Sequence, residues 1–143
     1  MNRSRLILSV AFLIVLAFSC KEKACGCFHP ESPLKGDWDL AKITYGLSQK
    51  TVTAAEAGYS ETLSFNNFSD VNGNYRRVRN GIPIETIPYS YNLPHGGSAE
   101  GIIFFPADTT QQSFRLSDNK LYLTERIPQG AVLADGSIYE YQR

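Results

Sequence analysis

Short segments in which apolar and polar residues alternate run from Leu34 to Arg143, and this period of two is typical of antiparallel β structure. In one segment Glu61, Leu63 and Phe65 share a strand face, and hydroxyl residues occupy the other face. Helical propensity is confined to about one turn at Thr53–Ala57. The pattern predicts about eight strands, at Asp37–Tyr45, Tyr59–Phe65, Asn74–Arg79, Ile82–Asn92, Gly101–Phe105, Ser113–Leu116, Lys120–Glu125 and Ser137–Gln142.

Pairs of turn-forming residues separate several of these segments. Asn72-Gly73, Asn80-Gly81, Asp118-Asn119 and Asp135-Gly136 each favour the positive φ angles that tight hairpins require. Consecutive hairpins without a long crossover predict an up-and-down meander, and closing the meander into a barrel removes its unpaired edges. The expected fold is therefore an all-β antiparallel barrel of about eight strands. A small β-sandwich is the alternative.

The first 19 residues have a different pattern and are expected not to join the fold. Arg3 and Arg5 precede the run Leu6–Phe18, which is apolar at every position but one. At about thirteen residues the run is shorter than the roughly 20 that span a bilayer, and it suits the apolar region of a secretory signal. It leads into Ser19-Cys20, a small residue before a cysteine, which resembles a bacterial lipobox. We expect residues 1–19 to be a cleaved signal peptide and Cys20 to be lipidated, with an ordinary signal peptide or an uncleaved anchor as alternatives.

A polar segment at residues 20–34 separates this leader from the first predicted strand. It has no apolar periodicity and indicates a tether, so the expected domains are a signal peptide at 1–19, a lipidated tether at 20–34 and a barrel at 35–143. Palmitate-type acyl chains on Cys20 would anchor the chain in a membrane. Lys21-Glu22-Lys23 also resembles the charged sorting segments of surface-exposed lipoproteins in some Gram-negative bacteria. These features predict attachment to the bacterial outer membrane, facing the periplasm or the cell surface.

The charge balance excludes one class of partner and leaves little material for catalysis. The chain has 14 basic and 14 acidic side chains, and loss of Arg3 and Arg5 with the leader leaves a small acidic excess. Without a basic patch, nucleic-acid binding is not expected. The sequence has no GxSxG nucleophile motif, and His29 and His95 are its two histidines. We therefore expect neither an enzyme nor a cofactor.

Cys25, Cys27 and His29 form the one cluster of soft metal ligands in the sequence. Structural zinc usually has four ligands, and the CxC spacing differs from the CxxC of zinc ribbons. In an oxidising compartment such thiols more often form a disulfide. We therefore predict a disulfide or plain tether residues here, and no metal site.

Gly36-Asp37-Trp38 opens the first strand with the GxW motif of lipocalins. The stretch Leu34 to Arg143 resembles the lipocalin-like domains of small bacterial lipoproteins, which share a Glu61–Phe65-type second strand, an Asn-Gly hairpin such as Asn80-Gly81 and a last strand like Tyr139–Arg143. This resemblance implies that Trp38 closes one end of the barrel and that Arg143 packs across its indole, with Gly36 as part of the motif. A guanidinium on an indole face is a favourable cation–π arrangement.

Period-two spacing places Tyr75, Arg77 and Arg79 on one face of the third predicted strand. If this face points into the barrel, Arg77 could pair with the carboxylate or phosphate head of an amphiphile. If it points outward, the residues form a solvated basic stripe. Val78, the one aliphatic residue of the strand, lies on the opposite face and favours the outward interpretation. The candidate ligand-binding residues are Tyr75, Arg77, Tyr139 and Tyr141.

Two functions remain open. The first is a carrier or sensor of a small hydrophobic or amphiphilic ligand, with a mouth formed by loops such as Gly46–Gly58 and Pro94–Glu100. The second is a filled barrel that binds an envelope protein as an accessory subunit or inhibitor. The lumen would be filled if all the large residues of the later strands pointed inward, namely Phe104, Phe105, Phe114, Leu121, Leu123, Tyr139 and Tyr141.

Overall fold

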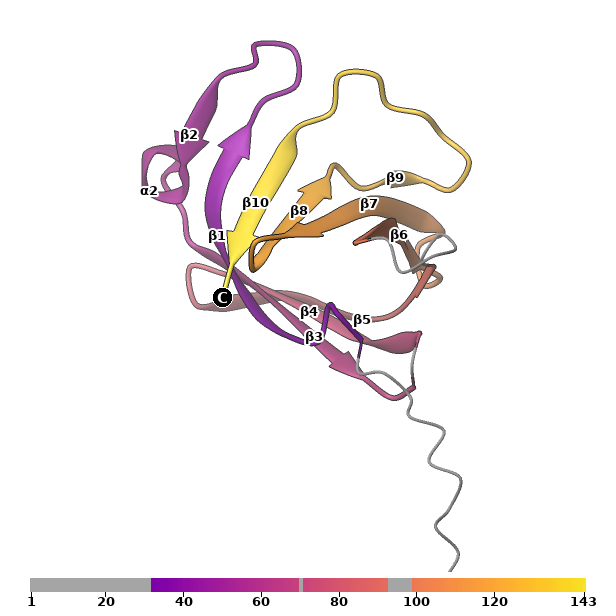
Figure 1. Ribbon diagram of the computed structural model, residues 1–143. Helices are drawn as coiled ribbons and strands as arrows, with labels where there is room; N and C mark the ends of the chain where they lie inside the picture. Colours follow the sequence, from indigo (N-terminus) through magenta and orange to yellow (C-terminus); the bar gives the residue numbers. More distant parts are fainter. Residues whose placement is uncertain (1–31, 70, 93–98) are drawn as a thin grey trace, which may run out of the picture.

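Antiparallel strands wrap around a common axis in the computed structural model, which describes residues 32–69, 71–92 and 99–143 (Figure 1). Within these residues the one helical turn is α2 (Ala54–Ala57), which begins with a capping box between Thr53 and Glu56. The strands are β1 (Gly36–Thr44), β2 (Thr51–Thr53), β3 (Glu61–Asn67), β4 (Asn72–Arg79), β5 (Ile82–Asn92), β6 (Glu100–Phe105), β7 (Thr110–Ser117), β8 (Lys120–Thr124), β9 (Ile127–Pro128) and β10 (Ile138–Gln142).

Pairing of the last strand with the first closes the sheet. The strands follow one another in the order β1-β3-β4-β5-β6-β7-β8-β10, and β10 then pairs with β1, with Leu40 opposite Tyr141 and Ile43 opposite Tyr139. The structure is thus a closed antiparallel barrel of eight strands, as the sequence predicts, and not a sandwich. Each predicted strand is present within a few residues. The pattern missed β2 and β9, which have three and two residues and pair on the outside with β1 and β7.

Two of the four predicted tight turns are correct. Asn80-Gly81 (φ 50° and 76°) joins β4 to β5, and Asp118-Asn119 (φ 52° and 60°) joins β7 to β8. Asn72-Gly73 is instead the start of β4, where a Cβ on Gly73 would lie 1.9 Å from the carbonyl oxygen of Asn66. Asp135-Gly136 lies in the long connection between β9 and β10, which do not pair with each other. An Asn-Gly pair can therefore mark a place where two backbones come close as well as a hairpin turn, and the local sequence pattern does not distinguish the two.

The closed end of the barrel is built around Trp38. Its indole Nε1 donates a 2.8 Å hydrogen bond to the carbonyl of Leu34, and the guanidinium of Arg143 stacks 4.1 Å from the ring centroid. Arg143 also donates to the carbonyl of Lys35, and Gly36 adopts a positive φ (121°) beside that guanidinium. The structure thus brings together the three residues of the lipocalin-like motif. Leu34, the last residue of the predicted tether, is fully buried beside this end of the barrel.

Aromatic rings fill the part of the lumen next to this closed end. Phe65 contacts Tyr75 and Tyr89 at centroid distances of 5.3 and 5.2 Å, and Tyr75 contacts Phe105 at 5.1 Å. Phe104 alternates away from this interior and is half-exposed. A completely filled lumen would require all the large residues of the later strands to point inward, and Phe104 does not. The remaining large residues of the predicted set, Phe114, Leu121, Leu123 and Tyr141, are buried, whereas Tyr139 is half-buried.

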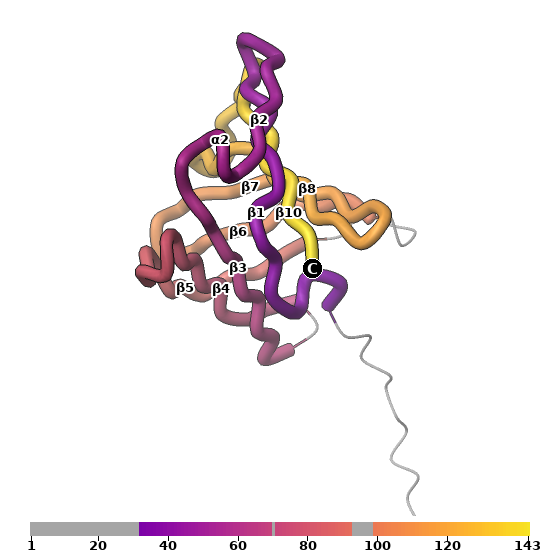
Figure 2. The backbone as a smooth tube through the Cα atoms, turned by 90° about the vertical axis from the view of Figure 1, so that its left-hand side faces the viewer, coloured from indigo at the N-terminus to yellow at the C-terminus, as the bar shows by residue number. Residues whose placement is uncertain are grey.

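Different segments of the chain lie at the two ends of the barrel. The β1–β2 loop and the connection between β9 and β10 project together at the top of Figures 1 and 2. Ser32, the first described residue, lies beside the closed end, where its hydroxyl accepts a hydrogen bond from the amide of Leu34, the residue bonded to Trp38. The described part of the chain contains no helix that is long and apolar enough to cross a membrane.

Candidate functional site

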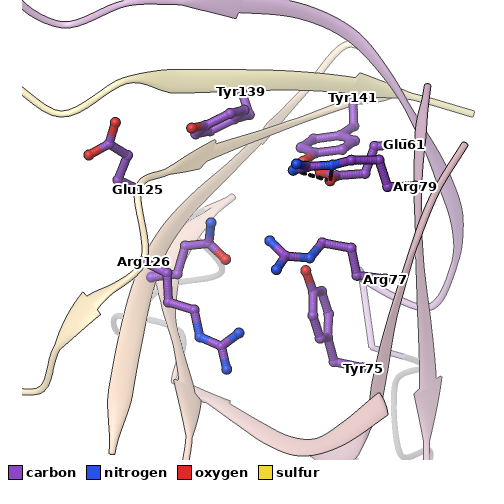
Figure 3. A pocket seen from close by; sticks show the side chains of 9 residues that line it. Glu61, Tyr75, Arg77, Arg79, Glu125, Arg126, Tyr139 and Tyr141 are labelled. Carbon is purple, nitrogen blue, oxygen red and sulfur yellow. Dashed lines mark hydrogen bonds and ion pairs between the residues drawn. The ribbon is translucent and has the colours of Figure 1, made fainter. Parts of the chain in front are cut away.

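A cavity of about 280 Å³ occupies the end of the barrel opposite Trp38, where β3 and β10 begin and β4 ends (Figure 3). Five of its nine lining side chains are charged and three are tyrosines, so its wall is polar. The lining residues are Glu61, Tyr75, Arg77, Arg79, Gln112, Glu125, Arg126, Tyr139 and Tyr141.

All four candidate ligand-binding residues, Tyr75, Arg77, Tyr139 and Tyr141, line this one cavity. The outward interpretation of the Tyr75–Arg79 stripe is therefore wrong. Arg77 lies opposite Leu63, a fully buried residue of β3, so the arginine face of β4 is the interior face. The arginines are stable inside because carboxylates from neighbouring strands face them, a condition that the composition of β4 alone does not show.

Glu61 is the centre of one polar network in the cavity wall. Its Oε2 accepts hydrogen bonds from Nε and Nη2 of Arg79 at 2.9 and 2.8 Å, and its Oε1 accepts one from the Tyr141 hydroxyl at 2.8 Å. The side chain of Glu61 is only 3% exposed, whereas that of Arg79 is 42% exposed. The hydrogen bonds to Glu61 raise the pKa of Arg79. Burial, followed by the charge of Glu61, raises the pKa of Tyr141 well above its usual value.

Arg126, just beyond β8, is the centre of a second network. Its Nη1 donates to Glu85 at 2.9 Å, its Nη2 to Asp108 at 2.7 Å and its Nε to Thr110 at 2.6 Å. The guanidinium also lies 3.8 Å from the ring centroid of Phe105. Burial alone would raise the pKa of Asp108, but the hydrogen bonds from Thr110 and the charge of Arg126 lower it overall. Every nitrogen of Arg126 is thus engaged within the protein.

Arg77 is the least satisfied of the three arginines. Its Nη2 lies 3.1 Å from Oε1 of Glu85, the carboxylate that also serves Arg126. Within the described part of the chain, the buried Nε of Arg77 and Oε1 of Glu85 have no hydrogen-bond partner. The Arg77 side chain is 32% exposed, and Figure 3 shows its guanidinium directed into the cavity. Arg77 therefore has a guanidinium that reaches the cavity and hydrogen-bonding capacity that the protein does not fully use, and such a group can bind an anion.

Neutral hydrogen-bonding groups complete the wall. Burial raises the pKa of Tyr75 and of Tyr139, with the charge of Glu125 adding to the shift at Tyr139, so both hydroxyls stay protonated at neutral pH. Gln112 donates its side-chain amide to the carbonyl of Thr124 at 2.6 Å. These groups can donate and accept hydrogen bonds without adding charge.

Several residues that line the cavity or contact its arginines were not predicted as site residues, and only some of them have a signal in the sequence. Glu61 has a signal, because it shares a strand face with Leu63 and Phe65, and a carboxylate on an apolar face needs a partner. Arg126 and Glu125 have none, since they follow β8 in an irregular segment. Gln112 and Glu85 lie on strands but look like ordinary polar positions.

Comparisons with known proteins identify no family. No family model matches the chain, and no curated protein matches it. Among solved structures, the fluorescent protein UnaG in its wild-type form is 12% identical, with a TM-score of 0.41, covering 76% of this chain and 96% of UnaG. Two UnaG variants are 11% and 12% identical, with TM-scores of 0.45 and 0.47, covering 76% of this chain and 94% of theirs. The fold assignment rests on the closure of the barrel itself.

Other candidate residues lie elsewhere. Cys20, Cys25, Cys27, His29 and His95 are outside the described residues. Within the described ranges, no group of histidine, cysteine, aspartate and glutamate side chains is arranged to hold a metal ion.

Proposed function

We propose that this protein is a lipid-anchored barrel of the bacterial outer membrane that binds a small amphiphilic ligand, with the anionic group of the ligand on Arg77. The observation that carries the proposal is the state of Arg77, a cavity-facing guanidinium that shares its one carboxylate with Arg126. A carboxylate or phosphate would satisfy its remaining donors in a bidentate pair.

The wall of the cavity favours an amphiphilic ligand over a purely hydrophobic one. The apolar half of the lumen is already filled by Phe65, Tyr75, Phe105 and their neighbours. An apolar ligand in the remaining space would strip water from charged side chains without replacing their hydrogen bonds, which is unfavourable. The volume of about 280 Å³ equals that of roughly nine water molecules, enough for a molecule of about a dozen non-hydrogen atoms.

The position of the expected tether is consistent with this role. Ser32 and Leu34 lie at the closed end, next to Trp38, whereas the cavity lies at the other end. An anchor on Cys20 would therefore leave the cavity on the side facing away from the membrane. The proposal of lipidation is tested by metabolic labelling with an alkyne-tagged palmitate. Label is expected on the wild-type chain and not on a Cys20→Ser variant, and equal labelling of the two would overturn it.

Binding is tested by calorimetric titration of the full chain, in a non-ionic detergent, with 3-phenylpropanoate. This probe has one carboxylate for Arg77 and is small enough for the volume of the cavity. Arg77→Gln is expected to weaken binding at least tenfold, because it removes a charge-assisted pair. The matched control is Arg76→Gln, on the exposed face of the same strand, which should leave the affinity unchanged. Absence of binding to the wild-type chain, or equal loss in both variants, would overturn the proposal.

A second function, binding of an envelope protein, is favoured by exposed apolar residues on the two projecting loops. Leu47 is 86% exposed in the β1–β2 loop and Val132 is 93% exposed in the connection between β9 and β10. Gly46 and Asp135 hold the two loops in backbone contact. A photo-crosslinking residue at Leu47 should give a discrete adduct in intact cells, and one at Ile82 on the barrel wall should not. Absence of an adduct at Leu47 would contradict this function.

A further inference from the structure

The cavity wall also includes a carboxylate, that of Glu125, for which the described residues provide no cationic partner. Glu125 follows β8 directly, and its Oε1 accepts a 3.2 Å hydrogen bond from the backbone amide of Ser137. No arginine or lysine of the described ranges forms an ion pair with it, although Arg126 is its neighbour in sequence. Arg126 is not available to Glu125, because its guanidinium is engaged by Glu85, Asp108 and Thr110.

Glu125 and Arg77 line the same cavity on opposite sides. Figure 3 shows Glu125 on the β8 side of the cavity and the Arg77 guanidinium on the β4 side, with Tyr139 along the wall near Glu125. Each has an incomplete set of partners: Arg77 has one shared ion pair, and Glu125 has one neutral donor. The cavity wall therefore includes a guanidinium that shares its carboxylate with a second arginine and a carboxylate that has no ion pair within the described ranges.

We infer that the ligand is a zwitterion of amino-acid size, with its carboxylate on Arg77 and its ammonium group on Glu125. This inference rests on the proposed function, because it uses the same cavity and the same role for Arg77. A ligand with only an anionic group would leave Glu125 without a cationic partner and would be repelled by it. A ligand with only a cationic group would meet the unmatched guanidinium of Arg77. A zwitterion satisfies both charges at once, and Tyr139 lines the same cavity as Arg77 and Glu125.

The test compares molecules that share a skeleton and differ in charge. The full chain in non-ionic detergent is titrated with phenylalanine, 3-phenylpropanoate and phenethylamine, and in parallel with 6-aminohexanoate and hexanoate. The two zwitterions differ in the separation of their charges, so the pair covers a short and a long distance between Arg77 and Glu125. At least one zwitterion is expected to bind ten times more tightly than the acid of the same skeleton. If neither zwitterion binds more tightly than its acid, the inference is overturned.

Two variants assign the charges to their partners. Glu125→Gln keeps the acceptor for Ser137, so the barrel should fold, and it is expected to lower the affinity for the zwitterion to that of the acid. The acid should bind this variant as well as, or better than, the wild-type chain. Glu140→Gln, which removes a carboxylate paired with Lys120 outside the cavity, is the matched control and should change neither affinity. A preference for the zwitterion that survives Glu125→Gln would also overturn the inference.

The outcomes separate this inference from the proposed function. Binding of the acids that depends on Arg77 but gains nothing from an ammonium group supports the proposed function and overturns the zwitterion. Binding by none of the five compounds overturns both.

Discussion

Replacement of Arg79 by methionine tests whether the buried Glu61 carboxylate depends on its ion pair. Glu61 receives two of its three hydrogen bonds from Arg79 and the third from Tyr141. Its side chain is 3% exposed, whereas the Arg79 side chain is 42% exposed and reaches solvent. The two partners are therefore not equivalent. Loss of Arg79 leaves a buried charge without its counter-ion, but loss of the Glu61 charge leaves an arginine that water can solvate.

The magnitudes follow from this asymmetry. Removing one partner of a buried ion pair costs about 3–5 kcal/mol, and the solvent exposure of Arg79 reduces this to about 2–3 kcal/mol of unfolding free energy. Glu61→Gln keeps the shape of the side chain and an acceptor for Tyr141, so we expect a loss of about 1 kcal/mol. With a urea slope of about 1–3 kcal/mol/M, Arg79→Met should lower the unfolding midpoint by about 0.7–3 M.

Urea unfolding followed by Trp38 fluorescence measures these differences, because the indole is buried at the closed end and away from the substitution. Arg76→Met is the control, since Arg76 lies on the exposed face of the same strand, and it should change the unfolding free energy by less than about 0.5 kcal/mol. The reasoning is refuted if Glu61→Gln costs as much as Arg79→Met, or if Arg79→Met costs no more than Arg76→Met.

Three further predictions concern other parts of the barrel. Because the pKa of Tyr141 is raised in the folded state, its contribution to stability is complete below about pH 10 and is lost as the pH rises further, by up to about 1.4 kcal/mol per pH unit. Urea midpoints measured from pH 8 to 11 should therefore fall only above pH 10, and they should fall less steeply in Tyr141→Phe. Gly73→Ala should lower the melting temperature more than Gly130→Ala, since a Cβ at Gly73 meets backbone at 1.9 Å, whereas one at Gly130 meets nothing within 4 Å and costs only the strain of its positive φ. Equal effects in differential scanning calorimetry would contradict the predicted backbone clash. Arg143→Ala should cost about 1–2 kcal/mol and shift the fluorescence of Trp38, and an unchanged emission spectrum would show that the stacking is absent in solution.

The extent to which the sequence determines this fold is clearest in the strands. The positions of β5 and β8, and the buried face of β3, follow from local alternation, because a strand with one face in a core must place apolar residues at every second position. The Asn80-Gly81 turn follows from the positive φ angles of its residues. The pairing of Trp38 with Arg143 followed from family resemblance rather than from the local pattern.

Only the tertiary structure decided which face of β4 lies inside and what the cavity contains. The single aliphatic residue of that strand, Val78, favoured the wrong face, because the interior here is polar. Its arginines are matched by Glu61, 18 residues before Arg79, and by Glu85, which Arg126 contacts from 41 residues further along the chain. Local periodicity shows which residues share a face. Which charges meet across the barrel depends on the register of strands far apart in sequence, and a shift of one residue would turn each side chain to the other face.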